Sequence, residues 1–90
     1  MKLKKGFVLR EVCGEKVIVG EGIETVNLGK LISLNDTAAM LWTKALELGD
    51  FTIGQLTDTL TEVYEVNHEQ ALNDVMRLTN GWKEAGLVEE

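Results

Sequence analysis

The stretch "GKLISLNDTAAMLW", Gly29–Trp42, changes its hydrophobic period halfway along and decides the fold. Its first part, "KLISL" (Lys30–Leu34), has the apolar and β-branched composition of a short strand. Asn35 follows at once, and asparagine is a favoured helix N-cap, so a helix is predicted over 36–48, where Gly49 would end it. No loop separates the two elements. The sequence therefore predicts a strand that is fixed directly to a helical layer.

Two further strands are predicted before this stretch. "FVLREVC" (Phe7–Cys13) and "KVIVG" (Lys16–Gly20) are rich in apolar and β-branched residues, and the Gly-Glu pair at 14–15 suits a tight hairpin turn between them. Cys13 is interpreted as a small apolar strand residue. A short extended piece is expected over 24–28. The basic segment "KLKK" at the start of the chain is predicted to be a solvated tail, with contact to an acidic surface as the alternative.

Two more helices are predicted in the second half of the chain. Thr52 and Gln55 match a capping box that opens a helix over 53–65, and Asn67 with Gln70 repeats the pattern before a helix over 68–85. The inward positions expected from helical spacing are Ala39, Met40, Trp42, Ala45 and Leu46; then Ile53, Leu56, Leu60, Val63 and Tyr64; then Leu72, Val75, Met76, Leu78, Thr79 and Trp82.

The order of these elements predicts one α+β domain over residues 1–90. It is winged-helix-like, with a three-stranded antiparallel sheet followed by three helices. No apolar run approaches the roughly 18 residues that a membrane span needs, and the N-terminus lacks the continuous apolar region of a signal peptide. With a single cysteine, these features predict a cytoplasmic protein that does not enter a membrane.

The charge distribution argues against nucleic-acid binding. Residues 1–30 hold six basic and four acidic residues, whereas residues 31–90 hold three basic and eleven acidic ones. The last predicted helix, which a winged-helix protein would place against DNA, offers Arg77 and Lys83 against Glu69, Asp74 and Glu84. Because binding grows with the number of phosphates that Lys and Arg neutralise, this helix is predicted to be repelled by DNA.

Enzymatic chemistry has little support in the sequence. The single histidine, His68, lies in the first turn of a predicted helix, where a solvent-exposed role is expected. "GEGIET" (Gly20–Thr25) begins like a dinucleotide-binding fingerprint, but Thr25 replaces the third glycine. No phosphate-binding loop or metal-ligand spacing occurs in the sequence. We therefore expect no catalytic residue, no metal and no cofactor.

The order of several short motifs resembles the PqqD-like family. These are a strand ending in Leu-Asn, "TAAMLW", "TIGQL", "LTEVY", and a last helix that carries "DV" and finishes "WKEAGLV"; together they cover about residues 7–88. The resemblance implies a non-catalytic peptide chaperone. Such a protein binds the leader segment of a ribosomally made precursor peptide and presents it to a modifying enzyme, often a radical-SAM protein. Members of the quinone-cofactor pathway usually carry a proline before the third strand. This chain has no proline, so another modified-peptide pathway is at least as well supported.

The resemblance also implies where the peptide binds. In the family, the leader adds as an extra strand along the third strand and packs against the last helix. The corresponding residues are Lys30, Leu31, Ile32, Ser33 and Leu34 in the strand, and Leu72, Val75, Met76 and Thr79 in the helix. Sequence leaves open which face of the strand is core, and whether Lys30 meets an acidic leader residue or only guards an edge. An open edge could also pair with a second copy, giving a homodimer.

Two other functions are kept as alternatives to the peptide chaperone. The second is a winged-helix DNA-binding or partner-docking regulator. The third is a binder of the quinone cofactor, although a polyanionic quinone would need a cluster of Arg and Lys that the acidic helical part does not provide.

Overall fold

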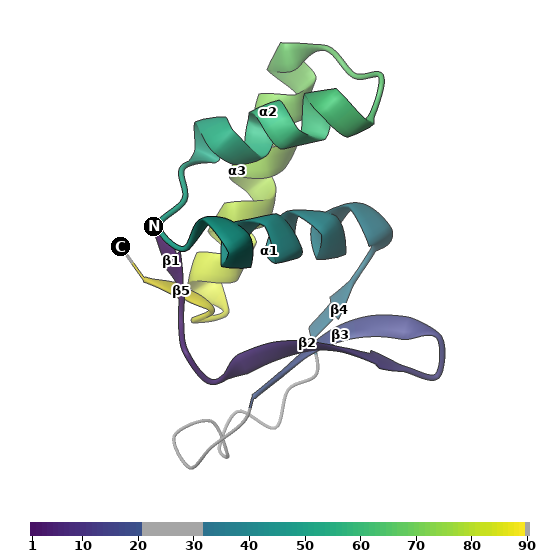
Figure 1. Cartoon of the computed structure of the whole chain (residues 1–90), viewed down its shortest axis with the longest axis vertical. Coiled ribbons are helices and arrows are strands. Elements are labelled where there is room, and N and C mark those ends of the chain that lie inside the picture. Colours follow the sequence, from purple (N-terminus) through teal and green to yellow (C-terminus); the bar gives the residue numbers. More distant parts are fainter. Residues whose placement is uncertain (21–31, 90) are drawn as a thin grey trace.

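The computed structural model describes residues 1–20 and 32–89, in which a sheet lies at one end of a layer of helices (Figure 1). The predicted α+β class, with a three-stranded antiparallel sheet followed by three helices, is confirmed. The predicted extended piece at 24–28 lies outside the described residues. The elements are β1 (Lys2–Leu3), β2 (Phe7–Val12), β3 (Glu15–Gly20), β4 (Ile32–Leu34), α1 (Asp36–Leu48), α2 (Ile53–Val63), α3 (His68–Glu84) and β5 (Val88–Glu89).

The main sheet has the order β2-β3-β4, and both pairings are antiparallel. Val12 pairs with Glu15, so the hairpin turn consists of Cys13 and Gly14, which both have positive φ, at 53° and 81°. Two-residue turns of this kind match the right-handed twist of the flanking strands. The turn therefore lies one residue earlier than predicted. Cys13 is an exposed turn residue, and its interpretation as a strand residue was wrong.

A second, small sheet joins the two ends of the chain. β1 pairs with β5 through Lys2↔Glu89 and Leu3↔Val88, and the Lys4 N–H donates to the Leu87 carbonyl at 2.8 Å. The predicted solvated tail was therefore wrong. Leu3 packs against the core while its lysine neighbours remain exposed, so this short segment buries one face as a strand does.

The first residue is held against the link between α1 and α2. Its ammonium group lies 2.8 Å from a carboxylate oxygen of Asp50, and the Phe51 N–H donates to the Met1 carbonyl at 2.7 Å. The hydrogen bond from this ammonium group, together with its charge, lowers the pKa of Asp50 below the ordinary value of 3.8. The N-terminal segment is thus tied to the helical layer as well as to β5.

The helix caps form as the sequence predicts. The side chain of Asn35 accepts the Ala38 N–H at 2.8 Å, and Gly49 ends α1 with a φ of 75°. Thr52 and Gln55 complete the capping box of α2. α2 and α3 end slightly before the predicted residues, at Val63 and Glu84. None of the described helices combines the length and the apolar character that crossing a membrane requires.

The core lies between α1, α2 and α3 and extends to the inner face of the sheet at Ile18. Its largest fully buried side chains include Trp42, Phe51, Ile18, Leu41 and Leu56, and Trp82 is 2% exposed. This confirms the interpretation of both tryptophans as core residues.

Four of the positions predicted to turn inward are exposed. Leu46 and Met76 are 55% and 43% exposed, because each lies about 100° around its helix from a buried neighbour, Ala45 or Val75. The other two, Val63 and Tyr64, end α2 beyond its last packed position at Leu60.

Candidate functional site

The strand β4 lies at the edge of the main sheet. It pairs on one side with β3, through Ile18↔Ile32, Val17↔Ser33 and Lys16↔Leu34. No residue in the described ranges 1–20 and 32–89 pairs with its other side. An edge of this kind carries N–H and C=O groups that can accept another extended chain.

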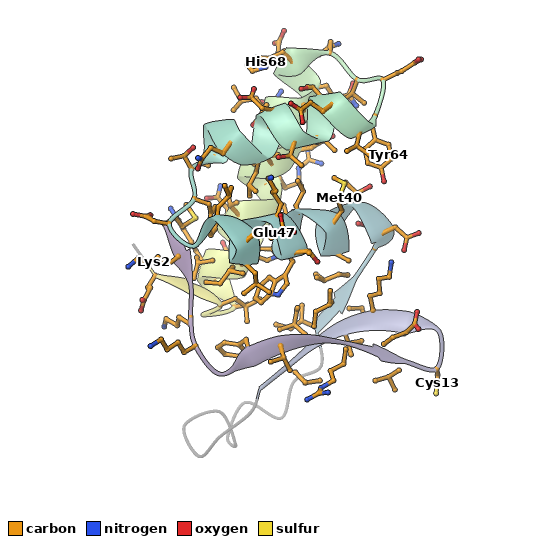
Figure 2. All side chains as sticks on the ribbon, in the orientation of Figure 1. Lys2, Cys13, Met40, Glu47, Tyr64 and His68 are labelled. Carbon is orange, nitrogen blue, oxygen red and sulfur yellow. The ribbon has the colours of Figure 1, made fainter. Side chains whose placement is uncertain are left out.

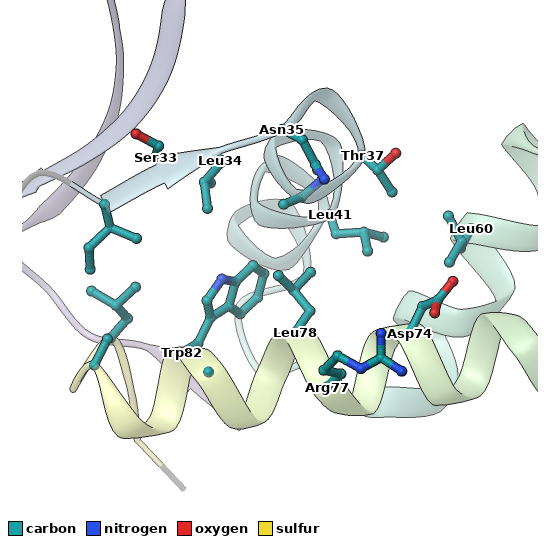
Figure 3. A pocket seen from close by; sticks show the side chains of 15 residues that line it. Ser33, Leu34, Asn35, Thr37, Leu41, Leu60, Asp74, Arg77, Leu78 and Trp82 are labelled. Carbon is teal, nitrogen blue, oxygen red and sulfur yellow. The ribbon is translucent and has the colours of Figure 1, made fainter.

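A groove of about 570 Å³ lies between β4, the start of α1 and one face of α3 (Figure 3). Asn35 links β4 directly to α1, so the strand cannot shift relative to the helix without disturbing the cap. The groove is lined by Ile32, Ser33, Leu34, Asn35, Thr37, Ala38, Leu41, Leu60, Asp74, Arg77, Leu78, Gly81, Trp82, Ala85 and Leu87.

The helical wall of the groove is a single stripe of α3 and its cap. It consists of Asp74, Arg77, Leu78, Gly81, Trp82 and Ala85, each of which has a partner three or four residues away in the set, as residues on one helix face do. Gly81 has no side chain, so the surface of the helix is recessed in the middle of this stripe. A Cβ atom added there would meet nothing within 4 Å. The wall is therefore open at its centre, beside Leu78 and Trp82.

The two ends of the groove differ in polarity. Trp82, Leu78 and Ile32 make one end apolar, and the buried indole ring of Trp82 lies beneath the strand (Figure 3). Asp74 and Arg77 lie at the other end, toward Leu60 of α2. Such a surface can hold an extended chain that carries both apolar and polar side chains.

The structure brings together the described strand residues of the predicted site. Ile32, Ser33 and Leu34 all line the groove. Ile32 and Leu34 are half-buried and pack against the core, whereas Ser33 is exposed, which answers the question of which strand face is core. Lys30 and Leu31 lie outside the described residues.

The helix residues of the predicted site lie on a different face of α3. Val75 and Thr79 are fully buried, and the Thr79 hydroxyl donates to the Val75 carbonyl at 2.9 Å. Leu72 is half-buried and Met76 is exposed. None of these four residues lines the groove, so a peptide contact through them stays a prediction.

Sequence reasoning did not identify Arg77, Gly81 and Ala85 as lining residues. The signal was present, because these residues share the helical spacing of Leu78 and Trp82, which were assigned to the core alone. A helix that packs on one side and lines a groove on the other has two such stripes, and periodicity alone does not separate them.

The single histidine and the acidic side chains do not come together at the groove in the part of the chain that the structure describes. His68 is exposed at the first position of α3 (Figure 2), and the first residue of that helix to line the groove is Asp74. In residues 1–20 and 32–89, no group of three or more His, Cys, Asp or Glu side chains could hold a metal ion. The groove is suited to binding.

Comparison with known proteins gives one family and two similar structures. The family model described as Coenzyme PQQ synthesis protein D (PqqD) matches residues 15–88. The first structure is described as TbiB1 in complex with the TbiA(beta) leader peptide; it has a TM-score of 0.79 and 17% identity, over 99% of this chain and 95% of that one. The second is a lasso peptide synthetase B1 complexed with the leader peptide, with a TM-score of 0.77 and 24% identity, over 99% and 96% of the two chains. At these identities the structures establish the shared fold. No curated protein matches the sequence.

Proposed function

The chain belongs to the family of coenzyme PQQ synthesis protein D, and from that premise we propose that it is a non-catalytic chaperone for a precursor peptide. It binds the leader segment of a ribosomally made peptide and presents that peptide to a modifying enzyme. The leader lies as an additional strand on β4, with its side chains in the groove against α3. The open edge of β4 beside this groove is the observation that carries the proposal.

Strand addition suits the geometry for a physical reason. An extended peptide has unpaired backbone groups that match those of an open edge strand, while pockets along the edge select alternate side chains. The cap at Asn35 holds β4 against α1, so the groove exists before the peptide arrives. Less conformational entropy is then lost on binding.

The length of the groove fits a short peptide segment. From Asp74 to Ala85 the helix axis advances about 16 Å, at about 1.5 Å per residue. An extended chain covers this length in about five residues. Such a segment would leave the rest of the precursor peptide free to enter an enzyme.

The two similar structures support this proposal. Both are described as complexes with leader peptides, and both share the fold over nearly the whole chain. The class of the modifying enzyme is a separate matter. A radical-SAM partner, the pathway of the quinone cofactor and a homodimer through β4 each stay a prediction drawn from the resemblance or from the open edge.

The alternatives from the sequence gain little from the groove. DNA and a polyanionic quinone both require several cations, and Arg77 is the single cationic side chain that lines it among the described residues. Neither ligand explains an open strand edge beside an apolar stripe.

A titration with a leader peptide tests the proposal. The probe is the fluorescently labelled leader of a short precursor peptide encoded next to the gene of this chain, and the control is a scrambled peptide of the same composition. We expect saturable binding of the leader and much weaker binding of the scrambled peptide. Equal affinity for both peptides, or no binding of either, would contradict the function.

A further inference from the structure

The groove between β4 and α3 has two chemically different ends, and we propose that it selects an extended peptide carrying an acidic side chain two positions before an apolar one. Arg77 pairs with the carboxylate, and the pocket beside Leu78 and Trp82 takes the apolar side chain. This inference deepens the proposed function and rests on it.

Arg77 is available to bind an anion. No ion pair or hydrogen bond joins its side chain to any residue that the structure describes, and the residue is exposed. Lys16, the cation opposite Leu34 in the sheet, is already held by Asp36 at 3.1 Å. A guanidinium group presents a planar fork of donors that matches both oxygens of a carboxylate. Among the described residues, Arg77 is therefore the cation that a peptide in this groove can reach.

Asp74 opposes the preference of Arg77 for an acidic peptide residue, but it lies farther along the groove. Asp74 lies one helical turn before Arg77, farther from Trp82 and next to Leu60 of α2 (Figure 3). Arg77 therefore lies closer than Asp74 to the part of the groove beside Leu78 and Trp82. Because Asp74 remains close enough to weaken the field of the guanidinium group, its removal should strengthen the binding of an acidic residue.

The spacing of the two peptide side chains follows from the rise per residue of a helix and of a strand. Arg77 and Trp82 are separated by about 7.5 Å along the helix axis, at about 1.5 Å per residue. Side chains two positions apart on one face of a strand are separated by about 6.6 Å. An acidic and an apolar side chain at positions i and i+2 of a bound strand therefore lie level with Arg77 and Trp82, respectively.

The order of the two side chains follows from the direction of the strand. β4 runs from Ser33 toward Asn35, whereas α3 runs the opposite way in the same view, from Asp74 toward Trp82 (Figure 3). Antiparallel pairing is the more stable arrangement for an added strand. A peptide antiparallel to β4 then runs in the same direction as α3. Its acidic residue at Arg77 comes first and its apolar residue at Trp82 second.

Selection from a displayed library tests this inference. The probe is a library of random peptides of about 12 residues, long enough to pass both ends of the groove. It is panned against the wild-type chain, Arg77→Glu and Asp74→Asn, each checked for folding by circular dichroism. The wild type should enrich peptides with the acidic-x-apolar pattern. Arg77→Glu should keep the apolar preference and replace the acidic residue with a basic one.

Affinities of the selected peptides provide a second readout. Arg77→Glu should weaken the binding of an acidic-x-apolar peptide by roughly five- to tenfold, and Asp74→Asn should strengthen it by about twofold. Peptides without a charge preference, or a basic residue enriched by the wild type, would overturn the inference but leave the peptide-binding function intact. A library that yields no binder to any variant would contradict the proposed function itself.

Discussion

The indole rings of Trp42 on α1 and Trp82 on α3 meet edge to face, with ring centroids 5.2 Å apart and an angle of 84° between their planes. α1 continues directly from β4, and α3 forms the opposite wall of the groove. The contact therefore links the two sides of the groove. The two rings therefore set the separation between the strand edge and the helical stripe. This aromatic pair therefore connects the hydrophobic core to the groove.

Replacing Trp42 with alanine should lower the free energy of unfolding by about 3–5 kcal/mol, because it removes a fully buried aromatic side chain and leaves a cavity. Chemical denaturation measures the change. Leu46→Ala on the same helix is the matched control, and because Leu46 is 55% exposed it should change the stability by less than about 1 kcal/mol. Equal losses in the two variants would contradict the described core.

Substitutions of Gly81 should separate stability from binding. Gly81→Ala should raise the free energy of unfolding by about 0.5–1 kcal/mol, because alanine favours a helix and its Cβ meets no neighbour within 4 Å. Gly81→Leu should remain folded and fill the middle of the groove, so leader affinity should fall at least tenfold, a change of about 1.4 kcal/mol. Thermal unfolding and a fluorescence titration measure the two effects. Unchanged affinity in Gly81→Leu would place the peptide elsewhere.

Proline substitutions in β4 should distinguish its two sides. Successive residues of a strand direct their N–H groups to opposite sides, so one of Ile32 and Ser33 donates to β3 and the other points to the open edge. Proline removes the donor. We therefore expect one of Ile32→Pro and Ser33→Pro to destabilise the domain, and the other to remain folded with weaker leader binding.

Ile32→Ala controls for the loss of the side chain at that position. Thermal unfolding identifies which proline variant stays folded, and titration with the labelled leader gives its affinity. Full affinity in the folded proline variant would argue against strand addition.

The ion pair at the N-terminus should make a pH-dependent contribution to stability. The pKa of Asp50 is lowered in the folded chain by the ammonium group of Met1, so the ionised carboxylate stabilises the fold. This contribution is complete above the unfolded pKa, near 3.8, and is lost as the pH falls through the lower folded pKa. Asp50→Asn should therefore be less stable than the wild type at pH 7, with a difference that shrinks in strong acid. Chemical denaturation of both proteins at pH 7 and in strong acid measures this difference in the free energy of unfolding. A difference that grows on acidification would contradict the ion pair between Asp50 and the Met1 ammonium group.

Local signals in the sequence predicted the helices and the junction of β4 with α1 well. Asn35, Thr52 and Gly49 act within a few residues of themselves, so their capping roles do not depend on the rest of the fold. The change of period within 29–42 placed β4 beside α1 for the same reason, since neither element needs a distant partner to be recognised.

The features that the sequence did not predict depend on distant partners. Lys2 and Leu3 become a strand only because β5, at the other end of the chain, pairs with them. The face of α3 that lines the groove depends on how far the helix is rotated by its packing against α2 and Trp42. Periodicity places the buried face of a helix to within about one residue. An error of that size is enough to confuse the face of Val75 and Thr79, which is buried in the core, with the face of Leu78 and Trp82, which lines the groove.

Amide hydrogen exchange at β4, with and without the leader peptide, tests the central claim most directly. If the peptide adds as a strand, the outward-facing N–H group among residues 32–34 should exchange at least about tenfold more slowly in the complex, while the exposed edge of β2 stays unchanged. A leader that binds and saturates the chain, yet leaves exchange at β4 unaltered, would contradict the account.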